Sequence, residues 1–522
     1  MDIRKYTALD IGNKIRNKEI SSPEVTKEYL KAIRELDKDI NSYISVDEKS
    51  AIRDAEAVQE RIDEGEFISP LAGVPLAVKD NICIEDGTTT SASKMLENFK
   101  PPYNATVIDK MKEYGAVILG KTNLDEFAMG GSTETSYFGV TKNPWDHNRV
   151  PGGSSGGSAS AVAAELAPYA LGSDTGGSIR QPCSFTNLTG IKPTYGSVSR
   201  FGLMAYASSL DQIGPMARSA RDCAVSLSMI SGIDLKDSTS VMEDQFDFCK
   251  QIESSDTTKD LKGMKIGIPA NYFEKGLSDD VKDKVLKAAS EFKSLGAETE
   301  EFEIPLIDYA VPAYYIIACA EASSNLSRYD GVKYGFRSEN AKDILEIYYK
   351  SRSEGFGTEV KRRIMLGSFV LSSGYFDAYY KKALKVRALV KKAFTDAFSK
   401  YDMILSPVSP TVSYKIGEQI SDPLSMYMAD IYTISINLAG LPSIALPCGI
   451  GEEGMPVGMQ LIGDSFTEDK LFTAAFAYQD NTDHHLKRPE TIGGGLFNRD
   501  RRDLRGGSET ITQDQSKKGG ER

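Results

Sequence analysis

The sequence predicts an α/β fold built on one large, mostly parallel sheet. From Leu71 onward, short apolar runs bounded by Gly and Pro recur along the chain, a pattern typical of buried strands. Amphipathic segments of helix length lie between these runs, for example 281–295 and 374–400. Strands that alternate with helices indicate an α/β sheet with parallel pairing. The chain has 522 residues, of which 40% are hydrophobic, so it can bury a sizeable core without disulfide or metal supports.

The chain before the first apolar run is expected to form an N-terminal helical segment, residues 1–66. Ser22 followed by Pro23 is typical of a helix N-cap and its first turn. The apolar positions that follow fall roughly on one helix face: Val25, Leu30, Ile33 and Leu36. A core domain is expected over 67–488. Residues 489–522 have few large apolar side chains and many glycines and charges, which predicts a disordered polar tail.

Six apolar runs are the expected strands of the core domain: VPLAV (74–78), AVIL (116–119), MKIGI (264–268), MILS (403–406), SIALP (443–447) and VGMQLIG (457–463). Residues 150–215 are rich in Gly and Ser and poor in charge, a composition that often indicates a flexible linker. The stretch AVAAELAPYALGSD (161–174) interrupts it with a helix-then-strand pattern. We therefore expect ordered turns inside the core.

Composition argues against several classes of function. Lys and Arg number 62 against 74 Asp and Glu, a formal net charge of −12, whereas binding nucleic acid by charge requires a basic face. The six cysteines are scattered without a C-x-x-C pair, which argues against a zinc site and favours reduced thiols. The N-terminus does not resemble a signal peptide, and the longest apolar run, 310–320, is shorter than the ~20 residues of a membrane helix. We expect a cytoplasmic protein without a metal site.

Histidine is scarce, which limits the possible mechanisms. His484 and His485 stand at the edge of the expected tail, so a Ser-His-Asp hydrolase would have to use His147. His147 lies in the turn-rich segment NPWDHNR, which is typical of a solvated loop. The chain also lacks a G-x-S-x-G motif in a strand–turn–helix context. A hydrolase built from this chain therefore needs a base other than histidine.

The segment 115–122, GAVILGKT, matches the phosphate-loop pattern G-x-x-x-x-G-K-[ST]. That pattern works through a flexible loop whose backbone N–H groups surround a phosphate. Here the variable positions are Ala-Val-Ile-Leu, which are strand-forming residues. We interpret the match as a coincidence; the alternative, a nucleotide-binding module, requires Lys121 to contact phosphate.

Two glycine–serine clusters, 151–158 and 172–180, are the strongest candidates for chemistry. Their glycines permit tight turns, and successive turn N–H groups can form an anion-binding nest. A serine at the end of such a nest lies beside oxyanion donors, as acyl transfer requires. Lys79 ends the apolar run VPLAVK, where burial would lower its pKa toward neutrality and make it a possible base. Polar loops and a solvated lysine remain the alternative interpretation.

The motifs GVPLAVKDN (73–81), PGGSSGGSA (151–159) and SDTGGSIRQP (173–182), in this order and spacing, resemble the amidase signature family. The resemblance covers roughly residues 70–480. It implies an amidase-signature fold, with a large mixed, mostly parallel sheet covered by helices on both faces. It also implies a Ser–Ser–Lys triad: Ser178 as nucleophile, Ser154 as the bridging serine and Lys79 as the base. The backbone N–H groups of Thr175, Gly176, Gly177 and Ser178 would form the oxyanion hole, and Asp174 and Arg180 would brace the loop.

Within this family the chain is most similar to the glutamine-hydrolysing subunits of tRNA-dependent amidotransferases. The similarity is carried by stretches such as TNLDEFAMGGSTETS (122–136), EVKRRIMLGSFVLSSGYFDAYYKKA (359–383) and NLAGLPSIALP (437–447). It implies a heterotrimer with amidotransferase subunits B and C, in which this chain hydrolyses glutamine and passes ammonia to the B subunit. That partner, with ATP and Mg, would bind Glu-tRNA(Gln) and convert it to Gln-tRNA(Gln), while the C subunit braces the pair. This chain would hold no cofactor; the alternative is a stand-alone amidase acting on small amides.

A glutamine site needs a cation for the α-carboxylate and an anion for the α-ammonium, and an arginine fork is the natural carboxylate ligand. By the same resemblance the cation comes from the segment KRRIM, with Arg363 favoured over Arg362. The anion is Asp430, and Tyr314 lines the pocket. A stand-alone amidase that takes apolar amides would not need such a charge pair.

Overall fold

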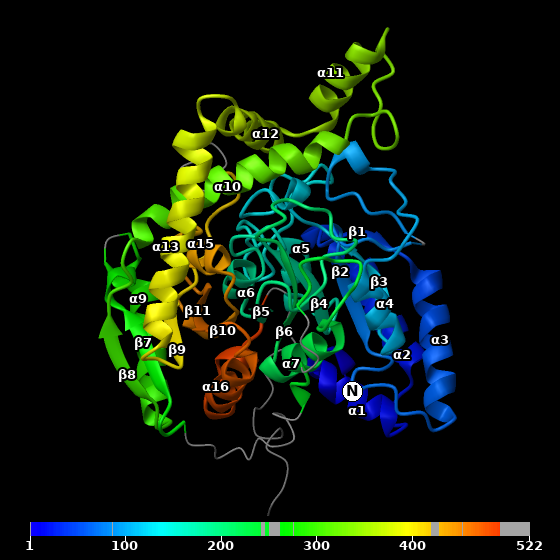
Figure 1. Ribbon diagram of the computed structural model, residues 1–522. Helices are drawn as coiled ribbons and strands as arrows, with labels where there is room; N and C mark the ends of the chain where they lie inside the picture. Colours follow the sequence, from blue (N-terminus) through cyan, green and yellow to red (C-terminus); the bar gives the residue numbers. More distant parts are fainter. Residues whose placement is uncertain are drawn as a thin grey trace, which may run out of the picture.

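The computed structural model describes residues 2–490 apart from 86, 242–245, 250–260, 275, 419–426 and 452. Its described strands form one eleven-stranded sheet in the order β1-β3-β2-β4-β6-β5-β10-β11-β9-β7-β8 (Figure 1). The strands are β1 (Tyr43–Val46), β2 (Pro75–Lys79), β3 (Val117–Thr122), β4 (Tyr169–Asp174), β5 (Thr189–Lys192), β6 (Gln212–Ala217), β7 (Lys265–Pro269), β8 (Glu298–Phe302), β9 (Met403–Pro407), β10 (Ser443–Ile450) and β11 (Pro456–Gly463). The six apolar runs singled out in the sequence correspond to β2, β3, β7, β9, β10 and β11, so all six predicted strands are confirmed.

The sheet is mixed, as expected, but parallel pairing is confined to two groups of strands. Strands β3, β2 and β4 are parallel to one another, and so are β9, β7 and β8. Between these groups, β6, β5, β10 and β11 pair antiparallel with their neighbours. The short connection 451–455 joins β10 directly to β11, and so short a link permits only antiparallel pairing. The expected predominance of parallel strands therefore does not extend through the centre of the sheet.

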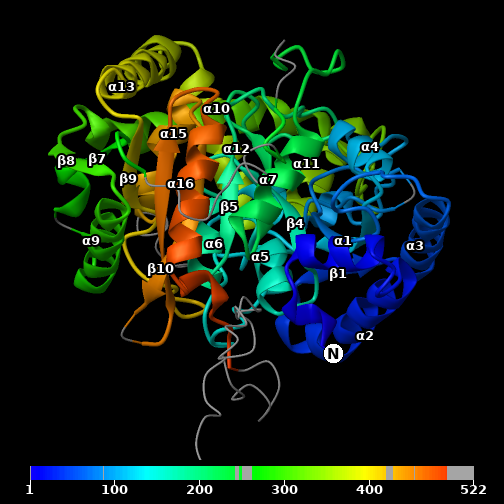
Figure 2. The ribbon, with the colours of Figure 1, turned by 90° about the horizontal axis from the view of Figure 1, so that it is seen from below.

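Helices cover both faces of the sheet (Figures 1 and 2). In β11, a Cβ added at Gly458 would meet Ser184 of α6, and one at Gly463 would meet Leu471 of α16. These two positions are an odd number of residues apart, so they point to opposite faces of the strand. The helices are α1 (Ala8–Arg16), α2 (Ser22–Ile40), α3 (Glu48–Asp63), α4 (Thr106–Glu113), α5 (Gly156–Ala163), α6 (Arg180–Thr186), α7 (Ala220–Ile230), α9 (Asp279–Ser294), α10 (Ala310–Asn325), α11 (Ile344–Gly355), α12 (Thr358–Leu371), α13 (Lys381–Phe398), α15 (Ile431–Ala439) and α16 (Glu468–Asn481).

The N-terminal segment is helical and also supplies one strand. Its strand β1 pairs antiparallel with β3 at the edge of the sheet. The N-cap of α2 is Ser21, one residue before the predicted Ser22. The Ser21 side chain accepts the Glu24 N–H, whereas the Ser22 hydroxyl donates to the Gly73 carbonyl at 2.8 Å inside the protein. The prediction of Ser22 as the cap is therefore wrong by one residue, because the Ser22 hydroxyl bonds to the Gly73 carbonyl instead of to the start of the helix.

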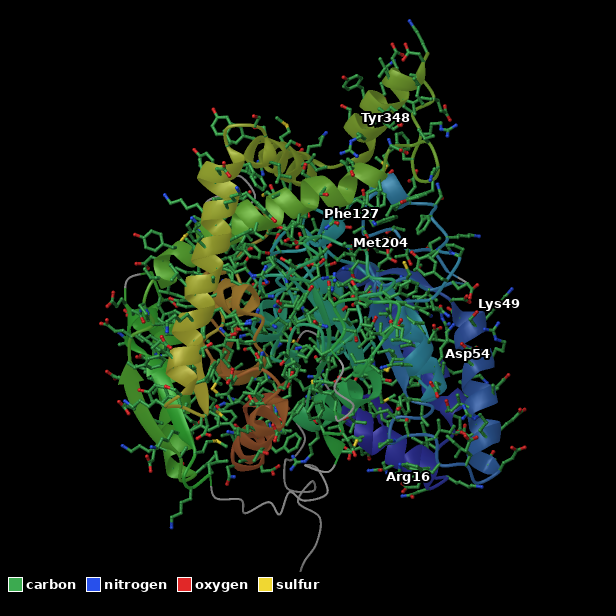
Figure 3. The ribbon with its side chains drawn as sticks, in the orientation of Figure 1. Arg16, Lys49, Asp54, Phe127, Met204 and Tyr348 are labelled. Carbon is green, nitrogen blue, oxygen red and sulfur yellow. The ribbon has the colours of Figure 1, made fainter. Side chains whose placement is uncertain are left out.

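The Gly- and Ser-rich stretch is ordered, as predicted, since it contains α5, β4, α6 and β5. The expected disordered tail lies outside the described residues, except for its first two positions. None of the described helices is long and apolar enough to cross a membrane. Helix α11 extends from the top of the molecule and carries Tyr348, whereas Phe127 lies inside beneath α10 (Figure 3).

Candidate active site

Lys79 is the last residue of β2 and is fully buried. Its Nζ lies 2.8 Å from both Ser154 Oγ and Ser155 Oγ, 3.0 Å from Ser173 Oγ and 3.2 Å from the Ser173 carbonyl oxygen. An ammonium group has three protons, so these four acceptors saturate it. The lysine predicted to be the base is therefore held among serine hydroxyls, one of which belongs to the predicted bridging serine.

Burial lowers the pKa of Lys79 to about 7, because taking the ammonium out of water disfavours its charged form. The carboxylates of Asp125, Asp174 and Asp211 oppose this effect and raise the pKa. A lysine that titrates near neutrality can accept a proton from a hydroxyl and return it to a leaving group. Lys79 thus has the protonation behaviour that general-base catalysis requires.

Ser154 lies in the loop that leads into α5, after a cis Gly153–Ser154 peptide bond. The Gly153 N–H donates to the side chain of Gln181 at 2.9 Å. A Cβ added at Gly153 would lie 2.1 Å from Asp125 Oδ2, so only glycine fits beside this buried carboxylate. Asp125 also accepts the N–H groups of Ser132 and Thr133. A buried aspartate therefore fixes the loop that presents Ser154.

Ser178 lies in the turn between β4 and α6 and is 8% exposed. Its carbonyl oxygen accepts the Ser155 N–H at 3.2 Å, so the two glycine–serine loops are joined directly. The Asp174 carboxylate accepts the N–H of Gly177 at 2.8 Å and pairs with Arg180 at 3.1 Å; both side chains are fully buried. Asp174 and Arg180 thus hold the turn that carries the predicted nucleophile.

The turn before Ser178 presents backbone N–H groups of the kind an oxyanion hole uses. Gly177 is the exception among the four predicted donors, because its N–H is already bonded to Asp174. Within the described part of the chain, the N–H groups of Thr175, Gly176 and Ser178 meet no acceptor. These three groups therefore remain available to a substrate oxygen.

Arg363 points from α12 into the protein and is 3% exposed. Its Nε lies 2.8 Å from Glu359 Oε1 and its Nη1 donates to the Tyr206 hydroxyl at 2.5 Å. Among the described residues Nη2 has no hydrogen-bond acceptor, so this nitrogen, with its two N–H groups, is available to a ligand. The Arg362 side chain is 39% exposed and pairs with the other oxygen of the buried Glu359 carboxylate. The geometry therefore places Arg363, rather than Arg362, where an internal carboxylate could bind.

Asp430 lies at the N-terminal end of α15, beside the tyrosines that surround Arg363. The Tyr315 hydroxyl is 3.5 Å from Asp430 Oδ2, and the Tyr315 ring centre is 5.5 Å from the Arg363 guanidinium. Burial raises the pKa of Asp430, and the positive charge of Arg363 opposes the rise. Tyr314 is 3% exposed, and a Cβ added at Gly176 would lie 2.5 Å from its hydroxyl. Tyr314 therefore packs against the turn of Ser178, and its ring neighbours that of Tyr315 with the ring centres 5.0 Å apart.

Comparison with known proteins agrees with this geometry. The profile of the family described as Amidase matches residues 24–472. The chain belongs to the amidase family. It is 58% identical to the A subunit of glutamyl-tRNA(Gln) amidotransferase from Agathobacter rectalis, over 92% of this chain and 94% of the relative. It is 53% identical to the corresponding protein of Enterococcus faecalis, which has the same name, over 92% of this chain and 96% of the relative.

Solved structures of amidase-family proteins show the same fold. The crystal structure of the glutamyl-tRNA(Gln) amidotransferase A subunit from Thermotoga maritima matches with a TM-score of 0.76 and 42% identity, covering 94% of this chain and 98% of that one. The peptide amidase of Stenotrophomonas maltophilia matches with a TM-score of 0.78 and 28% identity, covering 92% and 98%. The family fold predicted from the three motifs is therefore confirmed.

Four residues near the amidase site escaped sequence reasoning. Ser155 and Ser173 contact Lys79; both lie inside the quoted motifs 151–159 and 173–182, and this membership is the signal that could have identified them. Tyr206 and Tyr315 flank Arg363, but they lie far from it in the sequence and no local pattern links them to it.

Lys121, the lysine of the phosphate-loop pattern, is part of strand β3 and is 4% exposed. Its Nζ lies 2.9 Å from Asp80 Oδ1 and donates to the Ile82 carbonyl at 2.8 Å and to Thr89 Oγ1 at 3.0 Å. These contacts are internal to the amidase core, and the strand geometry leaves no phosphate-binding loop. The interpretation of the pattern as a coincidence agrees with this placement.

Replacing Lys121 tests that interpretation. Lys121→Met is expected to lower the free energy of unfolding by roughly 3–5 kcal/mol, because the Asp80 carboxylate would stay buried without its cation. Urea unfolding measures the loss, and equilibrium dialysis with an ATP analogue measures nucleotide binding before and after the substitution. Nucleotide binding that depends on Lys121 would contradict a purely structural role.

Proposed function

We propose that this chain is the glutamine-hydrolysing subunit of a tRNA-dependent amidotransferase. The observation that carries the proposal is the combination of two features in one site. The buried Lys79 contacts the Ser154 hydroxyl beside the Ser178 turn, which suits amide hydrolysis. The pair Arg363 and Asp430 suits the two charges of a free amino acid. The names of the relatives, which are subunits of glutamyl-tRNA(Gln) amidotransferase, support the same assignment.

In the proposed mechanism, Ser178 Oγ attacks the side-chain amide carbon of glutamine. Its proton passes to Ser154, whose own proton passes to neutral Lys79. The N–H groups of Thr175, Gly176 and Ser178 would stabilise the oxyanion; losing one such donor typically costs about 3 kcal/mol. The C–N bond then breaks, and the Lys79 proton returns through Ser154 to the departing ammonia. Water, activated by the same base, hydrolyses the acyl-enzyme to glutamate.

Substrate selection would come from the charge pair. The free Nη2 of Arg363 can donate to the α-carboxylate, while the Asp430 carboxylate accepts from the α-ammonium. An ammonium ligand would also keep Asp430 ionised despite its burial. Tyr314, which lies against Gly176, would line the path between the charge pair and the turn of Ser178.

The ammonia would be consumed by amidotransferase subunits B and C. We infer that the B subunit, with ATP and Mg, uses it to convert Glu-tRNA(Gln) to Gln-tRNA(Gln), and that the C subunit completes the heterotrimer. The net charge of −12 supports leaving tRNA binding mainly to the B subunit. With this division of labour we expect a cytoplasmic protein and no cofactor in this chain.

An exposed apolar surface on α12 and on the segment that joins α12 to α13 is the proposed docking site for one of these partners. Residues 371–379 are all exposed, and Met365 on the outer side of α12 is 72% exposed. The rings of Phe369 and Tyr375 lie 4.3 Å apart at its centre. We call this surface the α12–α13 patch; its members are Met365, Leu366, Phe369, Leu371, Tyr375, Phe376 and Tyr379. Exposed aromatic and methionine side chains in one area are typical of protein interfaces.

The charges around the α12–α13 patch indicate what covers it. Lys382 and Lys385 are exposed at the start of α13, whereas the exposed Asp377 within the patch segment is already paired with Lys381. A second copy of this chain would bring the same lysines against each other, so the complementary occupant is a different subunit with an acidic rim. Figure 1 shows α12 and α13 at the periphery of the molecule, accessible to such a partner.

A charge placed in the patch should break the complex without changing the site. Phe369→Asp is expected to weaken binding of the subunit that covers the patch by about 100-fold, because it buries an unpaired charge at the interface. Glutamine hydrolysis by the isolated chain should stay unchanged. The matched control is Tyr349→Asp on α11, a tyrosine that is 75% exposed outside the patch. Normal co-purification of the Phe369→Asp chain with its partners would place the interface elsewhere.

The proposed function is tested by ammonia release from glutamine, measured for the full chain with and without co-expressed subunits B and C. A low rate that rises with the partners, and again with ATP and Glu-tRNA(Gln), is expected. Glutamine analogues that lack the α-carboxylate or the α-ammonium should be poor substrates. A high partner-independent rate on simple apolar amides, with glutamine ignored, would instead indicate a stand-alone amidase.

A further inference from the structure

The loop 206–211 lies between the two halves of the site and contacts both. At its C-terminal end, Asp211 is 2% exposed. The Asp211 carboxylate accepts the Thr175 hydroxyl at 2.7 Å. It also accepts the backbone N–H of Tyr206 at 2.9 Å and that of Ala207 at 3.1 Å. One carboxylate therefore fastens the turn of the oxyanion donors to the start of this loop.

At the other end of the loop, Tyr206 contacts the arginine of the charge pair. Its hydroxyl accepts a hydrogen bond from Arg363 Nη1 at 2.5 Å, and its ring centre lies 5.4 Å from the guanidinium carbon. Tyr206 is 2% exposed, so packing fixes its ring. Glu359 on Nε and Tyr206 on Nη1 together set the plane of the guanidinium, and with it the direction of the free Nη2.

We propose that Asp211 is a positioning residue that sets the oxyanion turn and, through Tyr206, the orientation of Arg363 in one unit. Tyr206 then determines specificity for substrates with an α-carboxylate, although it need not touch the substrate. The inference rests on the proposed function, because it assigns Arg363 to the carboxylate of glutamine. It goes beyond that function by coupling substrate selection to the geometry of the chemical step.

Single substitutions separate the two roles. Tyr206→Phe keeps the ring and removes only the acceptor for Arg363, so KM for glutamine should rise about tenfold while kcat stays within about twofold. Thr175→Val removes the hydroxyl that binds Asp211 and should lower kcat by about tenfold. Thr175→Ser keeps that hydroxyl, so its kcat should stay close to that of the wild-type protein. A merely structural role would not divide the effects between KM and kcat in this way.

The double variant Tyr206→Phe/Thr175→Val tests the coupling itself. If the two single losses were independent, they would multiply in the double variant. If Asp211 links the two sites, the kcat/KM measured for the double variant should be at least about threefold higher than this multiplied value. Purely multiplicative losses would overturn the inference.

Asp211→Asn should impair both KM and kcat. Its matched control is Asp222→Asn, because Asp222 is a fully buried aspartate that accepts the Leu9 N–H elsewhere in the fold. Asp222→Asn should lower Tm without a change in KM.

The proposed function and the coupling through Asp211 can fail separately. These assays use the full chain together with subunits B and C, and the wild-type protein is measured first. Absence of glutamine hydrolysis in the wild-type complex would contradict the proposed function. Wild-type hydrolysis together with an unchanged KM in Tyr206→Phe would contradict this inference alone.

Discussion

Ser178→Ala is expected to abolish glutamine hydrolysis, with a loss of roughly 10⁴-fold or more in kcat, because the variant lacks the proposed nucleophile that forms the acyl-enzyme. Amidation of Glu-tRNA(Gln) by the assembled complex should nevertheless continue when ammonium is supplied in solution, because the amidating partner consumes ammonia whatever its source. Glutamate release and formation of Gln-tRNA(Gln), measured on the same preparation with glutamine or with ammonium chloride, give both results.

The matched control for Ser178→Ala is Ser158→Ala. Ser158 is a fully buried serine of the neighbouring helix α5, and its hydroxyl bonds to Thr122 and the Leu171 carbonyl, away from the proposed triad. This variant should lose stability and keep its hydrolysis. If ammonium-driven amidation disappeared in Ser178→Ala as well, Ser178 would have a structural rather than a catalytic role.

Lys79→Ala is the second change with a very large expected effect, a loss of roughly 10³–10⁴-fold in kcat. The lysine and the serines act as one unit, so combining Lys79→Ala with Ser178→Ala should add little to either loss. In the wild-type protein, kcat should fall about tenfold per pH unit below the pKa of about 7 and level off above it, because only the neutral amine accepts a proton and bound glutamine keeps Asp430 ionised. A pH profile of glutamine hydrolysis measures this limb directly.

Lys192 is the matched control for Lys79, because the two lysines are equally buried and differ in what their amines contact. It is 1% exposed, and burial lowers its pKa to about 7 as well. Its Nζ donates to the Pro193 carbonyl at 2.9 Å and contacts none of the serines around Lys79. Lys192→Ala should lower stability and leave the acid limb of the profile in place. If Lys79→Ala kept most of its activity, Lys79 would not be the base of the mechanism.

The sequence predicted which segments form strands better than how those strands pair. Runs such as SIALP and VGMQLIG indicate buried strands by their composition, and they became β10 and β11. Strand direction depends on connections and on partners distant in the chain, which periodicity within a run does not encode. The same limit explains Ser21 and Ser22, because which serine caps α2 depends on the contact between Ser22 and Gly73.

For the site, the sequence predicted the residues that lie in motifs and missed those that only folding brings together. Lys79, Ser154 and Ser178 each stand in a stretch of distinctive composition. Arg362 and Arg363 are adjacent and chemically identical, and one helical step of about 100° decides which of them points inward. Tyr206 reaches Arg363 across 157 residues of sequence, so no local signal could indicate the contact.

Helix α12 carries Arg363 on its inner side and Phe369 on its outer side, so one rigid element faces both the glutamine site and the α12–α13 patch. A partner that shifts this helix on docking would change the affinity for glutamine by some factor. Thermodynamic reciprocity then requires glutamine to change the affinity for the partner by the same factor. Assembly of the enzyme would thus respond to the supply of the amino acid, and ammonia would be released chiefly when a recipient is in place.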